Sequence, residues 1–225
     1  MPFDCTSSNT NLIYRGVSVD DIRGAVYPSW KGPTGTIANG PLTAGGLIPG
    51  KWNFGRGLRF TAANSQYINI GSLGVAGDFS IAFYIQTSNV IDWQGIFSTF
   101  NNNAALLDIL PGGGFYLYPS NQFPTFNAGE LNHIVWTRSG TTWTVYKNAV
   151  SQGDPVTHAV AGFAAGNKLW GRDRTYYLDG TLWEPRIYNV GLSQSDVTAL
   201  YAFAGEARQT IALKLGGGRI LPLKM

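Results

Sequence analysis

The sequence predicts an all-β protein, folded as a two-sheet antiparallel sandwich with one short helix on the C-terminal side. Three observations support this fold class. The 225 residues include 29 Gly and 11 Pro, which favour many short strands and turns. Only 13% of the residues are charged while 44% are hydrophobic, which suffices for a core and excludes a disordered chain. Short alternating apolar runs recur roughly every ten residues, as they do in sandwiches.

The predicted strands are unevenly distributed along the chain. Residues 1–56 hold one convincing alternating stretch, NLIYRGVSV at 11–19, so we expect an opening strand followed by long loops. Further strands are expected in GLRF, QYINIG and DFSIAFYIQT, the last of them half-buried, and then in WQGIFSTF, ALLDIL and FYLYPS, with PGGG as a turn. Residues 130–149, ELNHIVWTRSGTTWTVYKNA, are predicted to form a hairpin.

One helix is predicted, over residues 192–203, LSQSDVTALYAF. Ser193 and Asp196 have the spacing of a capping box, which satisfies the free amides of the first turn. Val197, Leu200 and Tyr201 are predicted to share one face of this helix.

The chain divides into a body, residues 1–203, and a basic extended C-terminal arm, residues 204–225. The arm carries the whole formal net charge of +3, so the body is neutral and lacks the basic stripe that a nucleic-acid partner requires. Within the arm, TIALKL and RILPLKM are β-patterned segments around a Gly triplet, and we expect them to lie unpaired until they dock on another chain. The predicted assembly residues are Arg208, Ile211, Leu213, Lys214, Leu215, Arg219, Ile220, Leu221 and Lys224.

Cysteine content and hydropathy exclude further classes of protein. A single cysteine, Cys5, excludes an internal disulfide and a cysteine zinc site. No apolar run approaches the roughly 20 residues that span a bilayer, so no membrane partner is expected. The N-terminal residues show no signal-peptide pattern, and we expect a protein made without one.

Five segments in order resemble the laminin G-like, concanavalin A-like jelly rolls found in bacterial and phage surface proteins. They are GLRFTAANSQYINIG, DFSIAFYIQT, LNHIVWTRSGTTWTVYKNA, NKLWGRD and YYLDGTLWEPRIYNVGLSQSDVTALY, and they cover residues 57–203. The resemblance implies a jelly-roll sandwich with a rim that binds carbohydrate or protein. It also implies a calcium ion held by Asp and Asn oxygens, although no loop of this sequence concentrates acidic ligands. The residues themselves predict no cofactor, and calcium follows from the resemblance alone.

Catalytic motifs are missing from the sequence. Glycoside hydrolysis needs two carboxylates, and none of the three glutamates belongs to an E-x-D-x-x-E pattern. Sialidase-like repeats are absent, because Arg138 stands where such a repeat has Asp. There is no G-x-S-x-G elbow, dinucleotide fingerprint or zincin motif. We therefore expect that the chain is not an enzyme.

Other polar and aromatic residues are expected to be structural. His133 lies in an apolar strand, Arg186 is predicted to brace the sheet or helix by ion pairing, and Asp179 to form a turn. Trp143 and Trp183 are predicted to pack in or near the core.

The candidate carbohydrate site combines aromatic rings, which stack on sugar faces, with amides, which hydrogen-bond sugar hydroxyls. Its residues are Trp93, Asn101, Asn102, Tyr118, Asn121 and Phe126. The alternative is that these residues form turns and that the rings fill the edge of the sandwich.

These observations favour a non-catalytic binding or structural module. We expect a displayed subunit or decoration protein of a larger assembly, such as a phage virion, docked by its C-terminal arm, with other protein subunits as partners and surface glycans as candidate ligands. The expected location is the surface of a virion or other extracellular particle. The alternatives are a free lectin-like protein and, third, an enzyme acting on polysaccharide.

Overall fold

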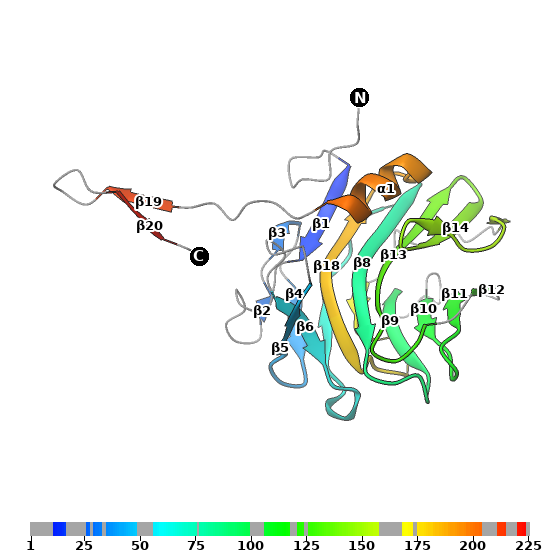
Figure 1. Cartoon of the computed structure of the whole chain (residues 1–225), viewed down its shortest axis with the longest axis horizontal. Helices are drawn as coiled ribbons and strands as arrows, with labels where there is room; N and C mark the ends of the chain where they lie inside the picture. Colours follow the sequence, from blue (N-terminus) through cyan, green and yellow to red (C-terminus); the bar gives the residue numbers. More distant parts are fainter. Residues whose placement is uncertain are drawn as a thin grey trace.

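Two antiparallel sheets lie face to face and enclose a core of aromatic and aliphatic side chains (Figure 1). This arrangement confirms the predicted sandwich. The computed structural model describes residues 11–16, 26–27, 29–32, 35–48, 56–75, 77–99, 106–117, 121–123, 126–157, 168–172, 175–203, 211–214 and 220–223. Within these residues, no helix combines the length and the apolar character needed to cross a bilayer.

In the described residues, the first sheet contains ten strands, with β8 and β18 at its centre. Its main order is β15 (Val150–Ser151), β14 (Thr142–Lys147), β13 (Leu131–Ser139), β8 (Phe79–Thr87), β18 (Gly180–Tyr188), β1 (Leu12–Gly16) and β3 (Ser29–Lys31). Beside this order, β16 (Val156–Thr157) pairs with β14, and β6 (Arg56–Phe60) pairs with both β18 and β5 (Thr43–Leu47). The predicted hairpin is confirmed as β13–β14.

The second sheet has eight strands among the described residues. They follow the order β12 (Asn121–Phe123), β11 (Phe115–Leu117), β10 (Leu106–Ile109), β9 (Gln94–Thr99), β17 (Lys168–Trp170), β7 (Tyr67–Asn69), β4 (Gly35–Ala38) and β2 (Val26–Tyr27). The prediction of long loops after the opening strand is therefore wrong for β2 to β5. These strands are two to five residues long, and β4 and β5 contain Gly and Thr, so their alternation is too brief to detect in the sequence.

The core is built from the inward-facing residues of the central strands. On β8, Phe79 and Phe83 alternate with residues of the opposite face, and their rings meet Trp136 and Trp170 edge-on at 5.4 Å and 5.7 Å. Trp143 stacks on Trp136 at 4.9 Å, which confirms its predicted core position. The Phe83–Trp170 contact joins β8 of the first sheet to β17 of the second, and the other two contacts fill the inner face of the first sheet.

Helix α1 (Gln194–Ala202) covers the outer face of the first sheet. Its predicted capping box is confirmed, because the Ser193 side chain accepts from the Asp196 amide and the Asp196 carboxylate accepts from the Ser193 amide. Leu200 and Val197 pack over Ala82 of β8, so β8 is buried on both faces and not half-buried as predicted. Of the three residues predicted to share one face of the helix, Val197 and Leu200 are buried and Tyr201 is 40% exposed.

A bulge in β18 buries an ion pair beneath the end of this helix. Glu184 has a φ of 48°, and the register with β8 shifts between Trp183 and Arg186. The Arg186 Nη2 atom donates to Glu184 Oε2 at 3.1 Å, and the guanidinium lies 4.9 Å from the ring centre of Phe203. Burial by itself would lower the pKa of Arg186, but Tyr188 and Glu184 raise it above its ordinary value. The predicted bracing role of Arg186 is confirmed.

The C-terminal segments form a hairpin of their own. Strand β19 (Ile211–Lys214) pairs antiparallel with β20 (Ile220–Leu223) as a separate two-stranded sheet, which Figure 1 shows apart from the sandwich. The expectation that TIALKL and RILPLKM lie unpaired is therefore wrong, because each segment satisfies backbone hydrogen bonds of the other.

Replacing Arg186 with Met would leave the Glu184 carboxylate buried without its cation. We expect the free energy of unfolding, measured by urea denaturation, to fall by about 3–5 kcal/mol. The double variant Glu184→Gln/Arg186→Met buries no charge and should lose less than Arg186→Met alone. A double variant less stable than the single one would contradict the ion pair's role as a matched buried unit.

Candidate functional site

Three loops meet at one end of the sandwich. Loop 88–93 joins β8 to β9, turn 110–114 joins β10 to β11, and loop 171–179 joins β17 to β18. The Ser88 amide donates to the Asp179 carbonyl at 2.8 Å, and the Gly112 amide donates to the Val90 carbonyl at 2.7 Å. These backbone hydrogen bonds hold both other loops against loop 88–93.

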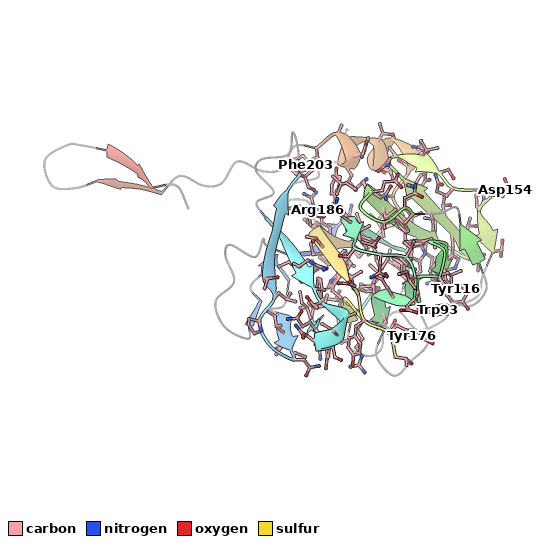
Figure 2. All side chains as sticks on the ribbon, turned by 60° about the horizontal axis from the view of Figure 1, so that its bottom comes forward. Trp93, Tyr116, Asp154, Tyr176, Arg186 and Phe203 are labelled. Carbon is pink, nitrogen blue, oxygen red and sulfur yellow. The ribbon has the colours of Figure 1, made fainter. Side chains whose placement is uncertain are left out.

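A cluster of three aromatic rings lies where these loops meet; we call it the ring cluster, and it consists of Trp93, Tyr116 and Tyr176. Trp93 stacks on Tyr176 with ring centres 5.7 Å apart and planes at 18°. Tyr116 meets Trp93 edge-on at 5.7 Å and 80°. Figure 2 shows the three rings together at one side of the molecule, away from Arg186 and Phe203. Tyr176 is 41% exposed, so the cluster presents ring surface to solvent.

Strand alternation explains why this aromatic surface faces outward. Phe115 of β11 is in the core, so its neighbour Tyr116 points to the opposite, outer face of the second sheet. Asp108 of β10 pairs in register with Tyr116, and it lies between two core residues, Leu107 and Ile109. Asp108 therefore shares the outer face with Tyr116, although only 2% of it is exposed.

A hydrogen-bond network centred on Asp179 positions the two loops that carry Trp93 and Tyr176. One carboxylate oxygen of Asp179 accepts from Arg59 Nη2 at 2.8 Å, and the other accepts from Asn89 Nδ2 at 3.0 Å. The buried side chain of Gln94 accepts from the Asp179 amide at 3.0 Å and donates to the Asn89 carbonyl at 2.7 Å. The turn predicted at Asp179 is wrong, because β18 already begins at Gly180 and Asp179 instead links the two loops through its carboxylate.

Turn 110–114 is confirmed where the sequence predicted it at PGGG. Gly112 and Gly113 have φ values of 87° and 88°, in the left-handed region that glycine tolerates. A Cβ atom on Gly113 would collide with the carbonyl oxygen of Phe126. This turn therefore requires glycine, and it brings β11 and Tyr116 back along β10.

The predicted carbohydrate residues are distributed differently from the expectation. Trp93 lies in the ring cluster. Phe126 is wrong as a binding platform, because it is 3% exposed and packs in the core against Phe115, with Lys147 Nζ over its ring at 5.6 Å. The backbone of Asn121 begins β12. The remaining three, Asn101, Asn102 and Tyr118, lie outside the described residues.

Sequence reasoning missed two members of the ring cluster. Tyr116 is two positions before Tyr118 and shares its parity in the strand, so the alternation of FYLYPS was a usable signal for it. Tyr176 is in a loop after β17, and no periodicity links it to Trp93. The long-range hydrogen bonds of Asp179 bring these two loops together.

Two other places were considered as sites. The pocket beneath helix α1 is lined by His133, Glu184, Arg186 and other buried residues, and its volume of about 10 Å³ is enough for one water molecule at most. It belongs to the structural ion pair, and its His133 ring packs on Tyr84 at 4.5 Å, consistent with the structural role predicted for that histidine. Across the described segments, no three His, Cys, Asp or Glu side chains gather as metal ligands.

Solved structures with this fold include both enzymes and binding domains. Trypanosoma rangeli sialidase matches with a TM-score of 0.67 at 11% identity, covering 92% of this chain and 36% of the sialidase. The binding domain of botulinum neurotoxin DC, in complex with rat synaptotagmin II, matches with a TM-score of 0.63 at 12% identity, covering 96% of this chain and 56% of that one. The binding domain of Paraclostridial mosquitocidal protein 1 matches with a TM-score of 0.64 at 12% identity over 85% and 52%.

These matches correct the expectation that the chain is not an enzyme. That expectation is wrong as an inference from sequence motifs, because several of the structures that share the fold are sialidases. The missing E-x-D-x-x-E pattern excludes one glucanase arrangement and does not exclude glycosidases in general. At 11–12% identity the likeness shows the fold alone, and this chain spans about a third of the sialidase length.

The family itself follows from the sequence match. No curated protein sequence matches the chain. A laminin G-type family model, described as the concanavalin A-like lectin/glucanases superfamily, matches residues 62–198, which is more than half of the chain. The fold, the order of its strands and this match agree, and the chain belongs to the concanavalin A-like lectin/glucanase superfamily as a laminin G-like module.

Proposed function

We propose that this chain is a carbohydrate-binding module and that the ring cluster is its sugar platform. The observation that carries the proposal is the stacked pair of Trp93 and Tyr176, which keeps ring surface in contact with solvent at the end of a rigid sandwich. Residues that fill the core clusters are buried, whereas the Tyr176 ring is exposed, so core packing does not explain its position.

The chemistry around the rings suits sugars. A pyranose has apolar C–H faces that pack on aromatic rings and hydroxyls that need hydrogen-bond partners. The exposed Asp92 adjoins Trp93 and can reach a ligand on its ring. Carboxylates accept hydrogen bonds from hydroxyls. Rings and acceptors are thus combined over loops that a stable scaffold positions.

We also propose that the C-terminal hairpin docks the module in a larger assembly, such as a virion whose surface displays the sandwich. The separation of β19–β20 from both main sheets supports this second proposal. An isolated two-stranded hairpin is marginally stable in water, so it gains stability from a partner. Of the predicted assembly residues, Ile211, Leu213, Lys214, Ile220 and Leu221 lie in the two strands, and Arg208, Leu215, Arg219 and Lys224 lie outside the described residues.

The sugar platform predicts that Tyr176→Ala weakens glycan binding. Removing the ring deletes one face of the stacked pair, so affinity for the best ligand found on a glycan array should fall roughly tenfold or more, as measured by calorimetry. Tyr201→Ala is the matched control, because Tyr201 on helix α1 is 40% exposed against 41% for Tyr176. Equal affinity in Tyr176→Ala and the unaltered chain would rule out the ring cluster as the platform.

The Asp179 network predicts a linked loss of stability and binding. Asp179→Ala removes the acceptor shared by Arg59 and Asn89, so we expect the free energy of unfolding to fall by about 1–3 kcal/mol. Glycan affinity should fall as well, because the loops carrying Trp93 and Tyr176 lose their link. Asp154→Ala, at an exposed position that Figure 2 shows far from the cluster, should change neither quantity. A stable Asp179→Ala variant with full affinity would show that the network does not position the rings.

Docking by the arm predicts that deletion of residues 205–225 abolishes particle association. Co-purification with the particle and light scattering should show the shortened chain free in solution, while its glycan affinity stays unchanged because the ring cluster lies in the sandwich. Normal incorporation of the shortened chain would refute the docking role.

A further inference from the structure

A second pair of aromatic rings lies beside the ring cluster; we call Tyr67 and Tyr177 the tyrosine pair. Tyr177 follows Tyr176 directly in loop 171–179, and its ring centre is 6.4 Å from that of Tyr67 on β7. The Arg172 guanidinium packs beside the two rings, 4.9 Å from the centre of Tyr67 and 5.2 Å from that of Tyr177. Both tyrosines are half-buried, so each keeps part of its surface open to solvent.

The local backbone fixes the tyrosine pair. Arg172 and Tyr177 face each other across an antiparallel bridge, and the Leu178 amide donates to the Gly171 carbonyl at 2.9 Å. The Ser98 hydroxyl donates to the Arg172 carbonyl at 2.8 Å and ties the loop to β9. The position of these rings therefore does not depend on a bound ligand.

Polar side chains lie next to the tyrosine pair on the outer face of the second sheet. Ile68 is in the core, so its neighbours Tyr67 and Asn69 on β7 lie on the outer face. The exposed Thr36 of β4 pairs in register with Asn69. Asn69 Oδ1 accepts from the Gly71 amide at 2.9 Å, a bond that orients the side chain without using its two N–H donors. A hydroxyl and an amide thus accompany the rings, as sugar recognition requires.

The outer face stays open beyond the tyrosine pair. The residue of β4 that pairs with Tyr67 is Ala38, and its methyl group is too small to block a sugar chain that passes over the ring. On the other side, Tyr177 adjoins Tyr176 of the ring cluster. A site that binds the end of a sugar chain needs a barrier at which the chain stops. The small residue at this position instead suits a chain that continues across β4.

The ring cluster and the tyrosine pair together extend over several strands. Tyr116 is on β11 and Tyr67 on β7, with β10, β9 and β17 between them. Four strand spacings make a length of roughly 19 Å. This length is several times the width of one sugar ring, so a single sugar cannot contact both groups of rings, whereas a chain of linked sugars can.

We propose that the tyrosine pair, Thr36 and Asn69 form a second sugar subsite, and that the ligand of this module is a linear oligosaccharide bound along its length. The inference rests on the proposed carbohydrate-binding function and adds the class of ligand. One sugar stacks at Trp93 and Tyr176. Another sugar of the same chain packs on Tyr177, with its hydroxyls bonded to Thr36 and Asn69.

The test measures how affinity depends on the length of the sugar chain. The probes are chito-, cello-, xylo- and manno-oligosaccharides, each from the disaccharide to the hexasaccharide, measured by calorimetry on the full protein. In at least one series we expect the affinity to rise about tenfold or more between the shortest chain that binds and the hexasaccharide. The reason is that a longer chain reaches both groups of rings at once.

Variants then assign this gain to the second subsite. Tyr177→Ala should lower the affinity for the hexasaccharide to that for the shortest chain, and leave the latter unchanged, whereas Tyr177→Phe keeps the ring and should retain most of the gain. Thr36→Val removes one exposed hydroxyl from another strand and should weaken hexasaccharide binding roughly three- to tenfold. Tyr201→Ala, on helix α1, is the control and should bind every chain as the unaltered protein does. Thermal unfolding checks that each variant is folded.

The outcomes separate this inference from the function on which it rests. Equal affinity for short and long chains in every series that binds, or a gain that a folded Tyr177→Ala variant retains, would overturn the second subsite and leave the platform at Tyr176. If Tyr177→Ala does not fold, full retention of the gain by Thr36→Val has the same meaning. No binding in any of the four series would overturn the subsite as proposed, and no binding across a wider glycan array would overturn the platform too.

Discussion

Strand β18 is the element on which both the fold and the site depend. It pairs with β8 along one side, while its two halves pair with different strands, β6 and β1, on the other. The bulge at Glu184 separates these halves and allows the change of partner from β6 to β1 within one strand. The ion pair with Arg186 fills the bulge beneath helix α1, because polar groups buried there need each other. The N-terminal end of the same strand begins directly after Asp179, so the scaffold and the loop network share one continuous segment.

This connection explains how a rigid body can support an exposed aromatic surface. The sheets bury their large rings in the core, where Trp136 and Trp170 are fully covered. The rings left outside, such as Tyr176, are held by loop hydrogen bonds and not by core packing. Loops in such a position can differ in sequence without unfolding the sandwich, which is why binding specificity is usually placed there. The functional surface is thus structurally separable from the core that holds it.

The sequence was informative where periodicity and burial coincide. The alternation in 78–87 and 130–149 predicted β8 and the β13–β14 hairpin, and the Ser193–Asp196 spacing predicted the cap of α1. Periodicity carries no information on which loops meet, so the contact between Tyr176 and Trp93 could not be predicted. For the same reason, the burial of Phe126 could not be predicted from its place near a turn. The short strands β2 to β5 escaped detection because they are shorter than a recognisable pattern and gain their stability from neighbours distant in the chain.

The neutrality of the body shapes how this surface can recognise a ligand. Outside the C-terminal arm, basic and acidic residues balance, so long-range attraction of a charged glycan is weak. Selectivity must then arise at contact distance, where one oriented charge in aromatic surroundings has a larger effect than the same charge in open water. The Arg172 guanidinium, which lies 4.9 Å and 5.2 Å from the ring centres of Tyr67 and Tyr177, is such an oriented charge, whereas an exposed surface lysine is not. A module of this kind discriminates through the strength of local contacts and not through the rate at which ligands are drawn to it.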